Sequence, residues 1–228
     1  MLFECPLIPA TFRDRPNRFL GVVQIGGKEV KCFIPNPGRM RELLHKGSKV
    51  YLIEKASDGR KTDYDLVVVD IDGTLISVDS RVPNKIAAEA IEGNLIQEFS
   101  GLSLERGEFV YGDSRLDFLL KGATDMLLLE VKSCTLVVSG TAIFPDAPTT
   151  RGRRHLAALT NGLTECRAAV IFIIQRPDAH YFRPNDATDP RFGESLREAA
   201  KRGVEIYAYN CDVDLEGISL KEKVPILL

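Results

Sequence analysis

The chain has 228 residues, of which 44% are hydrophobic and 27% are charged, and its formal net charge is −2. This length and apolar content suit one large or two modest globular domains, and the five scattered cysteines, with no CxxC pair, indicate neither a disulfide framework nor a zinc knuckle. No stretch approaches the ~20 apolar residues of a membrane span and the N-terminal segment does not resemble a signal peptide, so we expect a cytoplasmic protein without a membrane partner.

Positive charge is concentrated in the first quarter of the chain. Residues 1–61 carry 12 Lys and Arg against six Asp and Glu, a net charge of +6. The remaining 167 residues carry 18 basic and 26 acidic side chains, a net charge of −8. This asymmetry indicates a module that faces a polyanion, joined to a second unit of different character. A solvated basic surface without a partner explains the charge alone equally well.

Residues 1–81 have the pattern of a small antiparallel barrel. The first three strands are expected at residues 7–13, 19–25 and 28–34. The hairpin signal Gly26-Gly27 separates the second from the third, and a helix is expected within residues 36–45. Further strands are expected at residues 49–54, 66–71 and 75–78. This order predicts an OB-like β-barrel, a fold that often holds single-stranded nucleic acid in a basic groove lined with aromatics.

The barrel carries side chains suited to contact nucleic acid. Four aromatics on its strands have the right character for base stacking, although strand aromatics are more often core residues: Phe12, Phe19, Phe33 and Tyr51. Four basic residues are predicted to contact nucleic acid: Arg13, Arg18, Lys31 and Arg39. Arg39 follows the Pro37-Gly38 turn and is the leading candidate for a contact with the phosphate backbone.

The pattern changes at residues 80–84, and we place a second domain at residues 82–228. Asn84 is expected to cap a helix over residues 85–95. Two later helices are expected near residues 153–161 and 194–201. Strands are expected at residues 115–120, 126–131, 168–174 and 204–209. Helices that alternate with continuous apolar strands predict an α/β domain, with a mixed sheet covered on both faces, so the whole chain is α+β.

The segment VVVDIDGTL, residues 67–75, looks like the first signature of the haloacid dehalogenase superfamily, in which Asp70 would be the phosphoryl-accepting nucleophile. Asp113 and Asp117 mimic a second acidic signature of that superfamily. Only about 40 residues with a single helical pattern separate the two signatures, which is too few for the βα units that the fold requires between them. The phosphatase is therefore the less favoured hypothesis, and Asp72-Gly73 is interpreted as a tight turn between barrel strands.

Residues 113–136 carry charged side chains within two apolar strands. If these strands form a hairpin about residues 122–125, Asp117 faces Glu130 and Lys132 lies on the same face as Glu130. A one-residue slip in register would undo this arrangement. Like charges so close need compensation, which a divalent cation supplies. Two carboxylates that hold Mg²⁺ or Mn²⁺ beside a lysine form the arrangement that phosphodiester hydrolysis requires.

The order Asp, spacer and Glu-Val-Lys resembles the active site of the PD-(D/E)xK nuclease superfamily, which usually adds a Glu from the preceding helix. Glu89 fits that position. The resemblance therefore implies four catalytic residues: Glu89, Asp117, Glu130 and Lys132. The three carboxylates among them are the implied metal ligands. The motif has a Pro before the Asp, and this chain has Leu116 there instead. The alternative interpretation is a buried ion pair without catalysis.

Two further residues are predicted to bind nucleic acid near this site. Arg151 and His155 follow a proline-containing loop at the start of a helix, where they would grip phosphates beside the cleavage point. Asp146, in the same loop, is expected to cap that helix, with metal ligation as the alternative.

Several motifs, in the same order along essentially the whole chain, resemble those of the sugar fermentation stimulation protein family. They include NPGRM at residues 36–40, YGDSRLDFLL at 111–120, EVKS at 130–133, FPDA at 144–147 and DPRF at 189–192. The resemblance implies an OB-like domain followed by a restriction-endonuclease-like domain, DNA binding without marked sequence preference and a regulatory link to maltose use. It leaves open whether the protein cuts DNA or is a non-catalytic regulator, which strandedness it prefers, and whether it is a homodimer.

Overall fold

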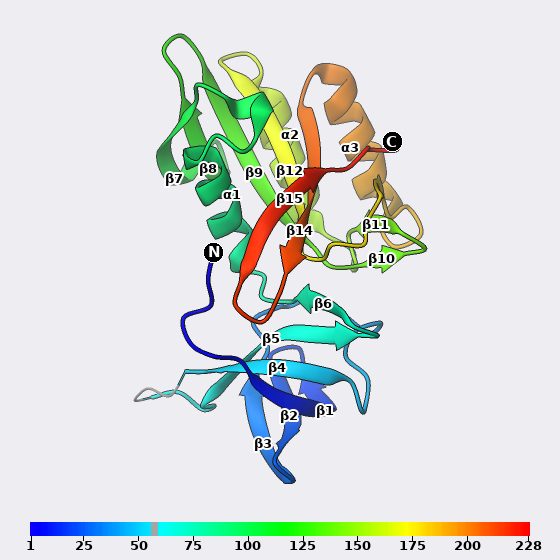
Figure 1. The fold of residues 1–228 in the computed structure, drawn as a ribbon. Coiled ribbons are helices and arrows are strands. Elements are labelled where there is room, and N and C mark those ends of the chain that lie inside the picture. Colours follow the sequence, from blue (N-terminus) through cyan, green and yellow to red (C-terminus); the bar gives the residue numbers. More distant parts are fainter. Residues whose placement is uncertain (56–58) are drawn as a thin grey trace.

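The computed structural model describes residues 1–55 and 59–228, which form two domains, one above the other in Figure 1. The strands of the first are β1 (Ile8–Asn17), β2 (Leu20–Ile25), β3 (Lys28–Phe33), β4 (Lys49–Glu54), β5 (Tyr64–Ile71) and β6 (Thr74–Ser77). They are ordered β3-β2-β1-β4-β5-β6, and β3 also pairs with β5. This last pairing closes the sheet, so the OB-like barrel is confirmed.

Strand β4 shows how alternation builds this barrel. Val50 and Leu52 belong to the interior cluster, whereas Tyr51 and Ile53 belong to a smaller cluster on the other face. Phe3 of the N-terminal segment packs against that second cluster. Because β4 is covered on both faces, its sequence reads as a continuous apolar run instead of alternating with polar residues.

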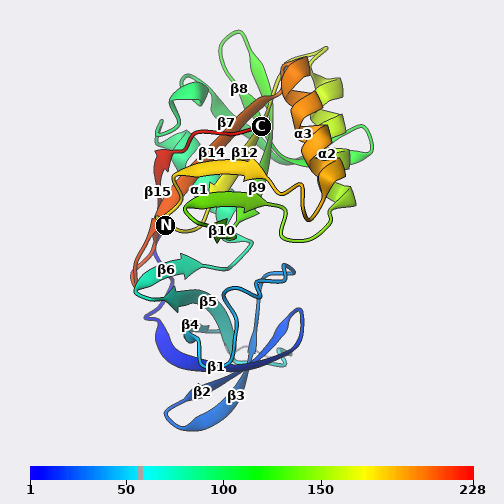
Figure 2. The ribbon, with the colours of Figure 1, turned by 90° about the vertical axis from the view of Figure 1, so that its right-hand side faces the viewer.

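The connection between β3 and β4 contains turns where a helix is expected at residues 36–45. Pro35 and Pro37 have no amide proton, and Met40 adopts the left-handed region with φ 45°. The Oδ1 atom of Asn36 accepts a hydrogen bond from the amide of Gly38 at 2.8 Å, which forms a turn instead. The expected helix is therefore wrong, and in Figure 2 this connection rises from the barrel toward the second domain.

The second domain contains a six-stranded mixed sheet ordered β15-β14-β12-β9-β8-β7. Its strands are β7 (Ser103–Tyr111), β8 (Ser114–Lys121), β9 (Met126–Cys134), β12 (Arg167–Ile174), β14 (Glu205–Val213) and β15 (Ile218–Lys223). Strands β9, β12 and β14 run parallel, and the other pairings are antiparallel. A small second sheet consists of β10 (Val137–Val138), β11 (Thr141–Phe144) and β13 (Tyr181–Pro184).

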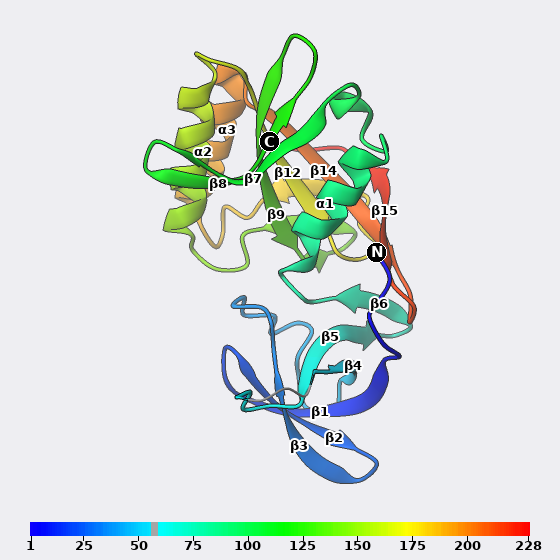
Figure 3. The ribbon, with the colours of Figure 1, turned by 90° about the vertical axis from the view of Figure 1, so that its left-hand side faces the viewer.

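Helices cover both faces of the large sheet, as predicted. Helix α1 (Val82–Glu92) and the short 3₁₀ helix η1 (Gln97–Phe99) lie on one face, and α2 (Thr150–Gly162) and α3 (Pro190–Arg202) lie on the other (Figure 3). None of the helices described is long and apolar enough to cross a membrane. Helix α1 begins at the predicted domain boundary between residues 81 and 82, and that division stays a prediction.

Helix α1 begins three residues earlier than the sequence suggests, so Asn84 lies inside the helix and does not cap it. Pro83 is tolerated in the first turn because its missing amide proton would have no helical acceptor there. The N-cap residue is Arg81, which makes no capping hydrogen bond through its side chain. The side chain of Asn84 consequently points to a different partner, described below.

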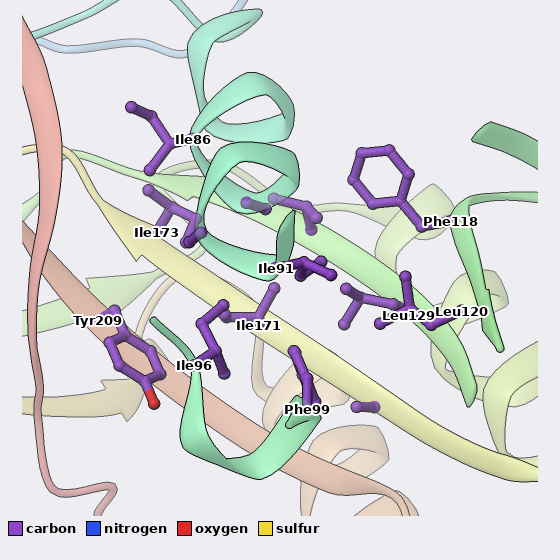
Figure 4. Packing of buried hydrophobic residues seen from close by; sticks show 14 of the residues in the cluster. Ile86, Ile91, Ile96, Phe99, Phe118, Leu120, Leu129, Ile171, Ile173 and Tyr209 are labelled. Carbon is purple, nitrogen blue, oxygen red and sulfur yellow. The ribbon is translucent and has the colours of Figure 1, made fainter. Parts of the chain in front are cut away.

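The core under α1 is made of aliphatic side chains from the helix and the central strands. Ile86 and Ile91 of α1 pack with Leu129 of β9 and with Ile171 and Ile173 of β12 (Figure 4). A second cluster fills the space between the opposite face and helices α2 and α3. The central strands are buried on both faces, which explains their continuous runs of Leu, Val and Ile.

Replacing Leu129 with Ala should lower the free energy of unfolding by about 2–5 kcal/mol, because the change removes buried methyl groups and leaves a cavity. Leu129 is fully buried. Urea denaturation would measure the change. As a control, Leu95→Ala alters a side chain that is 64% exposed and should change stability by less than about 0.5 kcal/mol. Equal losses in the two variants would contradict the assignment of Leu129 to the core.

Candidate functional site

The β8–β9 hairpin has the register that the sequence predicts. Phe118 pairs with Leu129 at the end of the hydrogen-bonded ladder, and the next residues along the two strands are Asp117 and Glu130. The Oδ2 atom of Asp117 accepts a hydrogen bond from the backbone amide of Val131 at 2.8 Å. The two carboxylates therefore lie side by side where the strands separate.

A cleft of about 520 Å³ lies where the barrel meets the second domain. Its walls come from the β3–β4 connection, the segment that leads into α1, the adjoining parts of β8 and β9, and the start of α2. Its charged lining residues are Arg81, Asp117, Glu130, Lys132, Asp146 and Arg151. Both domains thus contribute to one site, which contains the predicted Asp117, Glu130 and Lys132 together.

Glu130 is almost completely buried at this cleft, with an exposed fraction of 2%. Its Oε1 atom contacts both Lys132 Nζ and His155 Nδ1. Burial by itself would raise the pKa of Glu130, but the hydrogen bond from His155 and the charge of Lys132 outweigh it and lower the pKa. Glu130 is consequently held as a carboxylate.

The other oxygen of Glu130, Oε2, is buried and has no hydrogen-bond partner within the described part of the chain. Leaving such an atom unsatisfied costs about 1–3 kcal/mol, and buried polar atoms are normally paired. A divalent cation at Oε2 would remove this cost. No group of three or more His, Cys, Asp and Glu residues suited to a metal occurs in residues 1–55 and 59–228. The protein would therefore supply two carboxylates, as Mg²⁺ sites completed by water and phosphate commonly do.

The pKa of Asp117 is shifted in the opposite direction to that of Glu130. Burial raises the pKa of Asp117, and the neighbouring Glu130 raises it further. The amide of Val131 and the side chain of Asn84, whose Nδ2 lies 2.8 Å from Asp117 Oδ1, lower it by less. A cation between the two carboxylates would relieve their repulsion. The residues present therefore fit a divalent cation on Asp117 and Glu130.

Glu89, the predicted third ligand, does not line this cleft. Its carboxylate is 54% exposed and pairs with the amino group of Met1 at 2.9 Å. Asn84 of the same helix reaches Asp117 instead. Five residues rotate a helical side chain by about 140°, so Asn84 and Glu89 face different sides of α1. The structure therefore does not bring Glu89 to Asp117 and Glu130 as predicted, and Asn84, expected to cap the helix, contacts Asp117 in its place.

Arg151 and His155 lie one turn apart on α2 but differ in exposure. His155 is 2% exposed and contacts Glu130, so it does not reach a phosphate backbone as predicted. Arg151 is exposed, lines the cleft and donates from Nε to His155 Nε2 at 3.3 Å. Both contacts are made together when Nδ1 donates to Glu130 and Nε2 accepts from Arg151. His155 is thus a positioning residue for Glu130.

Asp146 joins the two domains and does not cap α2. Its Oδ2 atom accepts a hydrogen bond from the backbone amide of Arg39 at 2.8 Å. A Cβ atom on Gly38 would lie 2.5 Å from the same oxygen, so only glycine permits this approach. Thr149 caps α2 by accepting from the amide of Gly152 at 3.0 Å. Gly38 lines the cleft and Arg39 does not, so Arg39 marks the rim of the cleft at this point, and its side chain is exposed.

Gln175 makes a second tie between the domains. Its backbone carbonyl accepts from the amide of Ser77 at 3.0 Å, and its side chain contacts the Ser77 hydroxyl at 3.0 Å. Its Nε2 atom donates to the hydroxyl of Ser133 at 3.0 Å. Ser133 follows Lys132 on β9, so this contact connects the barrel to the strand that carries the site.

The other basic residues predicted to bind nucleic acid lie on the barrel, outside the cleft lining. The guanidinium of Arg13 donates to the side chain of Gln24. Arg18 is exposed, with its guanidinium carbon 5.7 Å from the centre of the Phe19 ring. Lys31 is exposed on β3. Arg13 is therefore partly engaged within the barrel, whereas Arg18 and Lys31 remain on its surface.

Only one of the predicted aromatic platforms is well exposed. Phe12 and Tyr51 have exposed fractions of 2% and 7% and are core residues, as strand aromatics often are. Phe19 is 43% exposed. Its ring lies nearly parallel to that of the partly buried Phe33, at an angle of 21° and a centroid distance of 6.0 Å.

The Asp-rich segment that resembles a phosphatase signature forms the β5–β6 hairpin. Asp70 pairs with Lys49 at 2.9 Å and accepts from the amide of Gly73 at 2.8 Å. Asp72 and Gly73 both have positive φ, 51° and 86°, as a two-residue hairpin turn requires. Neither aspartate lines the cleft. Turn geometry therefore accounts for this segment.

The opposed pKa shifts predict opposite effects of removing each carboxylate charge in the presence of EDTA. Asp117→Asn should raise the free energy of unfolding at pH 7, because the folded protein disfavours the ionised form of Asp117. That gain should disappear as the pH falls through the raised pKa toward 3.8, the ordinary value.

Glu130→Gln should instead lower the free energy of unfolding at pH 7 by about 1–3 kcal/mol, since it removes a charged hydrogen-bond acceptor. The lowered pKa of Glu130 stabilises the fold above pH 4.5, and this stabilisation is lost as the pH falls further through the folded pKa. Urea denaturation across pH 3–8 would measure both variants. Parallel pH profiles for the two would contradict the opposed shifts.

Comparisons with known proteins agree with this architecture. The model of the SfsA N-terminal OB domain matches residues 14–78, and that of the sugar fermentation stimulation protein RE domain matches residues 81–217. A sugar fermentation stimulation protein homolog from Caldanaerobacter subterraneus subsp. tengcongensis is 45% identical to this chain, over 100% of each of the two chains. Another from Moorella thermoacetica is 48% identical, over 97% of each chain. A solved structure of Pyrococcus furiosus SfsA in complex with Ca²⁺ has a TM-score of 0.93 and 33% identity, over 100% of this chain and 98% of that one. The chain therefore belongs to the sugar fermentation stimulation protein family.

Proposed function

We propose that this protein binds DNA largely without sequence preference and holds Mg²⁺ or Mn²⁺ on Asp117 and Glu130 for phosphodiester hydrolysis. The observation that carries the proposal is the buried Oε2 atom of Glu130, which has no partner among the described residues and lies in a cleft shared by both domains. The Ca²⁺ bound by the Pyrococcus furiosus relative supports a site for a divalent cation. When bound, such a cation polarises a phosphate oxygen and lowers the pKa of water.

The surrounding side chains have distinct tasks in this proposal. His155 and Lys132 hold Glu130 through Oε1, which leaves Oε2 toward the cation. Asn84 fixes the orientation of Asp117 by donating to its Oδ1 atom. The ammonium of Lys132 is a donor without acceptor capacity and is placed to stabilise negative charge on a phosphodiester under attack. Arg151 lines the cleft and is proposed to contact a neighbouring phosphate.

The barrel is proposed to hold the nucleic acid next to this site. Arg39 lies at the rim, while Arg18 and Lys31 present positive charge on the barrel surface. Arg13, already bound to Gln24, is proposed to contribute mainly to the local potential. The name of the relatives supports a regulatory link to sugar metabolism, for which we propose maltose use.

A DNA-binding regulator without catalysis is the second candidate function. The observation that favours it is the limited ligand set: Glu89 points away, and Oε1 of Glu130 is occupied by Lys132 and His155. In this case Glu130, Lys132 and His155 form a buried polar cluster that only stabilises the fold. DNA binding would then persist in the presence of EDTA, and no strand cleavage would follow.

Isothermal titration calorimetry with Mn²⁺ and the nicking of supercoiled plasmid test the metal site. The wild type should bind Mn²⁺ and nick the plasmid, and both Asp117→Asn and Glu130→Gln should abolish these properties because each removes a ligand charge. Asp70→Asn is the matched control, since Asp70 lies in a surface ion pair of the barrel. This control should bind and nick like the wild type.

Three results separate the candidate functions. Mn²⁺ binding without nicking by the wild type would favour the non-catalytic regulator. The absence of Mn²⁺ binding would remove the metal site from the proposal. If the wild type hydrolysed a generic phosphate ester and Asp70→Asn lost that turnover, the phosphatase hypothesis would replace both.

Arg39→Ala should weaken DNA binding by a similar factor for unrelated sequences, because a phosphate contact carries no sequence information. The slope of log affinity against log salt should fall in magnitude by about 1, as expected for one lost phosphate contact. Fluorescence anisotropy over a range of KCl concentrations measures both effects. Arg202→Ala, whose side chain is 61% exposed at the end of α3, is the control and should leave the slope unchanged. A sequence-dependent loss in Arg39→Ala would contradict the assignment.

A further inference from the structure

We infer that this protein takes a single strand of nucleic acid, which stacks on Phe19 beside Arg18 and enters the cleft past Arg39. The inference rests on the proposed function and specifies its substrate class. It is carried by three features of the structure: the depth of the carboxylates, one exposed aromatic ring on the barrel, and a set of hydrogen bonds that joins this ring to the rim of the cleft.

The depth of the carboxylates limits what can reach them. Glu130 is 2% exposed, and Asp117 is half-buried. The cleft volume of about 520 Å³ lies within the range of pockets that hold a single small molecule, about 300–1,000 Å³. On the side toward the barrel, the hydrogen bond from the Arg39 amide to Asp146 holds the β3–β4 connection against the cleft. A phosphate therefore reaches the carboxylates on a strand that has left the duplex, as a nucleotide does in base-processing enzymes.

The exposed ring on the barrel fits an unpaired base. Phe19 lies in the turn between β1 and β2 and is 43% exposed, in contrast to the buried Phe12 on β1. Exposure of a phenyl face to water is unfavourable, and stacking with a base would remove it from water. The guanidinium of the exposed Arg18 lies over the ring, with its carbon 5.7 Å from the ring centre, and the Phe33 ring is nearly parallel to that of Phe19. An aromatic face beside a cation is the combination with which single-strand-binding proteins hold bases without sequence preference.

Arg15 connects this platform to the cleft. Its guanidinium donates to the backbone carbonyls of Arg18 at 2.7 Å, Asn36 at 3.0 Å and Arg39 at 2.6 Å. Asn36 lines the cleft. Arg15 therefore holds the turn that carries Phe19 at a fixed position relative to the rim of the cleft. Both segments belong to the same side of the barrel, below the second domain in Figure 2. A strand that leaves Phe19 is therefore directed toward the carboxylates.

Positive charge continues along this route, which suits a phosphodiester backbone. Exposed arginines occur at the platform, at the rim and inside the cleft, namely Arg18, Arg39, Arg81 and Arg151. Arg81 is already paired with Asp79 and Asp65, so it contributes less net charge than the other three. A flexible single strand can adjust to charges spread over both domains, whereas a stiff duplex can do so only by bending.

Fluorescence anisotropy in EDTA tests the inference with the full chain. The probes are a labelled oligonucleotide of about 12 nucleotides, within the range of OB-fold site sizes, and the duplex of the same sequence. The wild type should bind the single strand at least about tenfold more tightly than the duplex. Phe19→Leu should weaken binding of the single strand by about tenfold, the scale of one lost base stack. Phe19→Tyr keeps the ring and should keep the affinity.

Tyr181→Ala is the matched control, because Tyr181 is an aromatic residue of β13 with a similar exposed fraction of 47% and lies outside the cleft lining. It should leave binding of both probes unchanged. Equal or tighter binding of the duplex would overturn the inference and leave DNA binding itself intact. Unchanged single-strand affinity in Phe19→Leu would overturn the platform. Binding of neither probe would overturn both the inference and the proposed function.

Discussion

The burial of one carboxylate is the constraint on which the rest of this site depends. Glu130 lies on β9, in the middle of a sheet that helices cover on both faces. A charge in that position is stable only if other groups compensate it. Lys132 supplies a positive charge from the same strand, and His155 supplies a hydrogen bond from α2. One oxygen is thereby satisfied. The second oxygen has no partner in residues 1–55 and 59–228 and gives the cleft its affinity for a cation in our proposal.

The two domains are coupled through the walls of this cleft. Asp146 holds the β3–β4 connection of the barrel through the amide of Arg39, and Gln175 joins the end of the barrel to the strand that carries Lys132. The barrel and the second domain are therefore held in one arrangement around the carboxylates. In the proposed function, this coupling explains how the nucleic-acid-binding surface of the barrel and the metal-binding cleft can act on the same nucleic-acid molecule.

The parts of the site that were predictable from sequence are those set by local geometry. The β8–β9 register followed from side-chain alternation and a short turn, and the structure has the same pairing of Phe118 with Leu129. The position of Glu89 was not predictable in this way, because the face of α1 that meets β8 depends on how the helix packs. His155 is likewise a residue type that often binds phosphate. Its burial beside Glu130 results from the packing of α2 on the sheet, which the local sequence does not show.

The amino-acid sequence by itself determined the order of barrel and mixed sheet, the continuous apolar strands and the register that places Asp117 beside Glu130, because these depend on periodicity and turns. Only the tertiary structure decided that Asn84 and not Glu89 reaches Asp117, and that Asp146 joins the domains instead of capping a helix. These contacts join residues far apart in the chain. Which residues meet in these contacts is set by the packing between helices, strands and loops, which no local sequence pattern encodes.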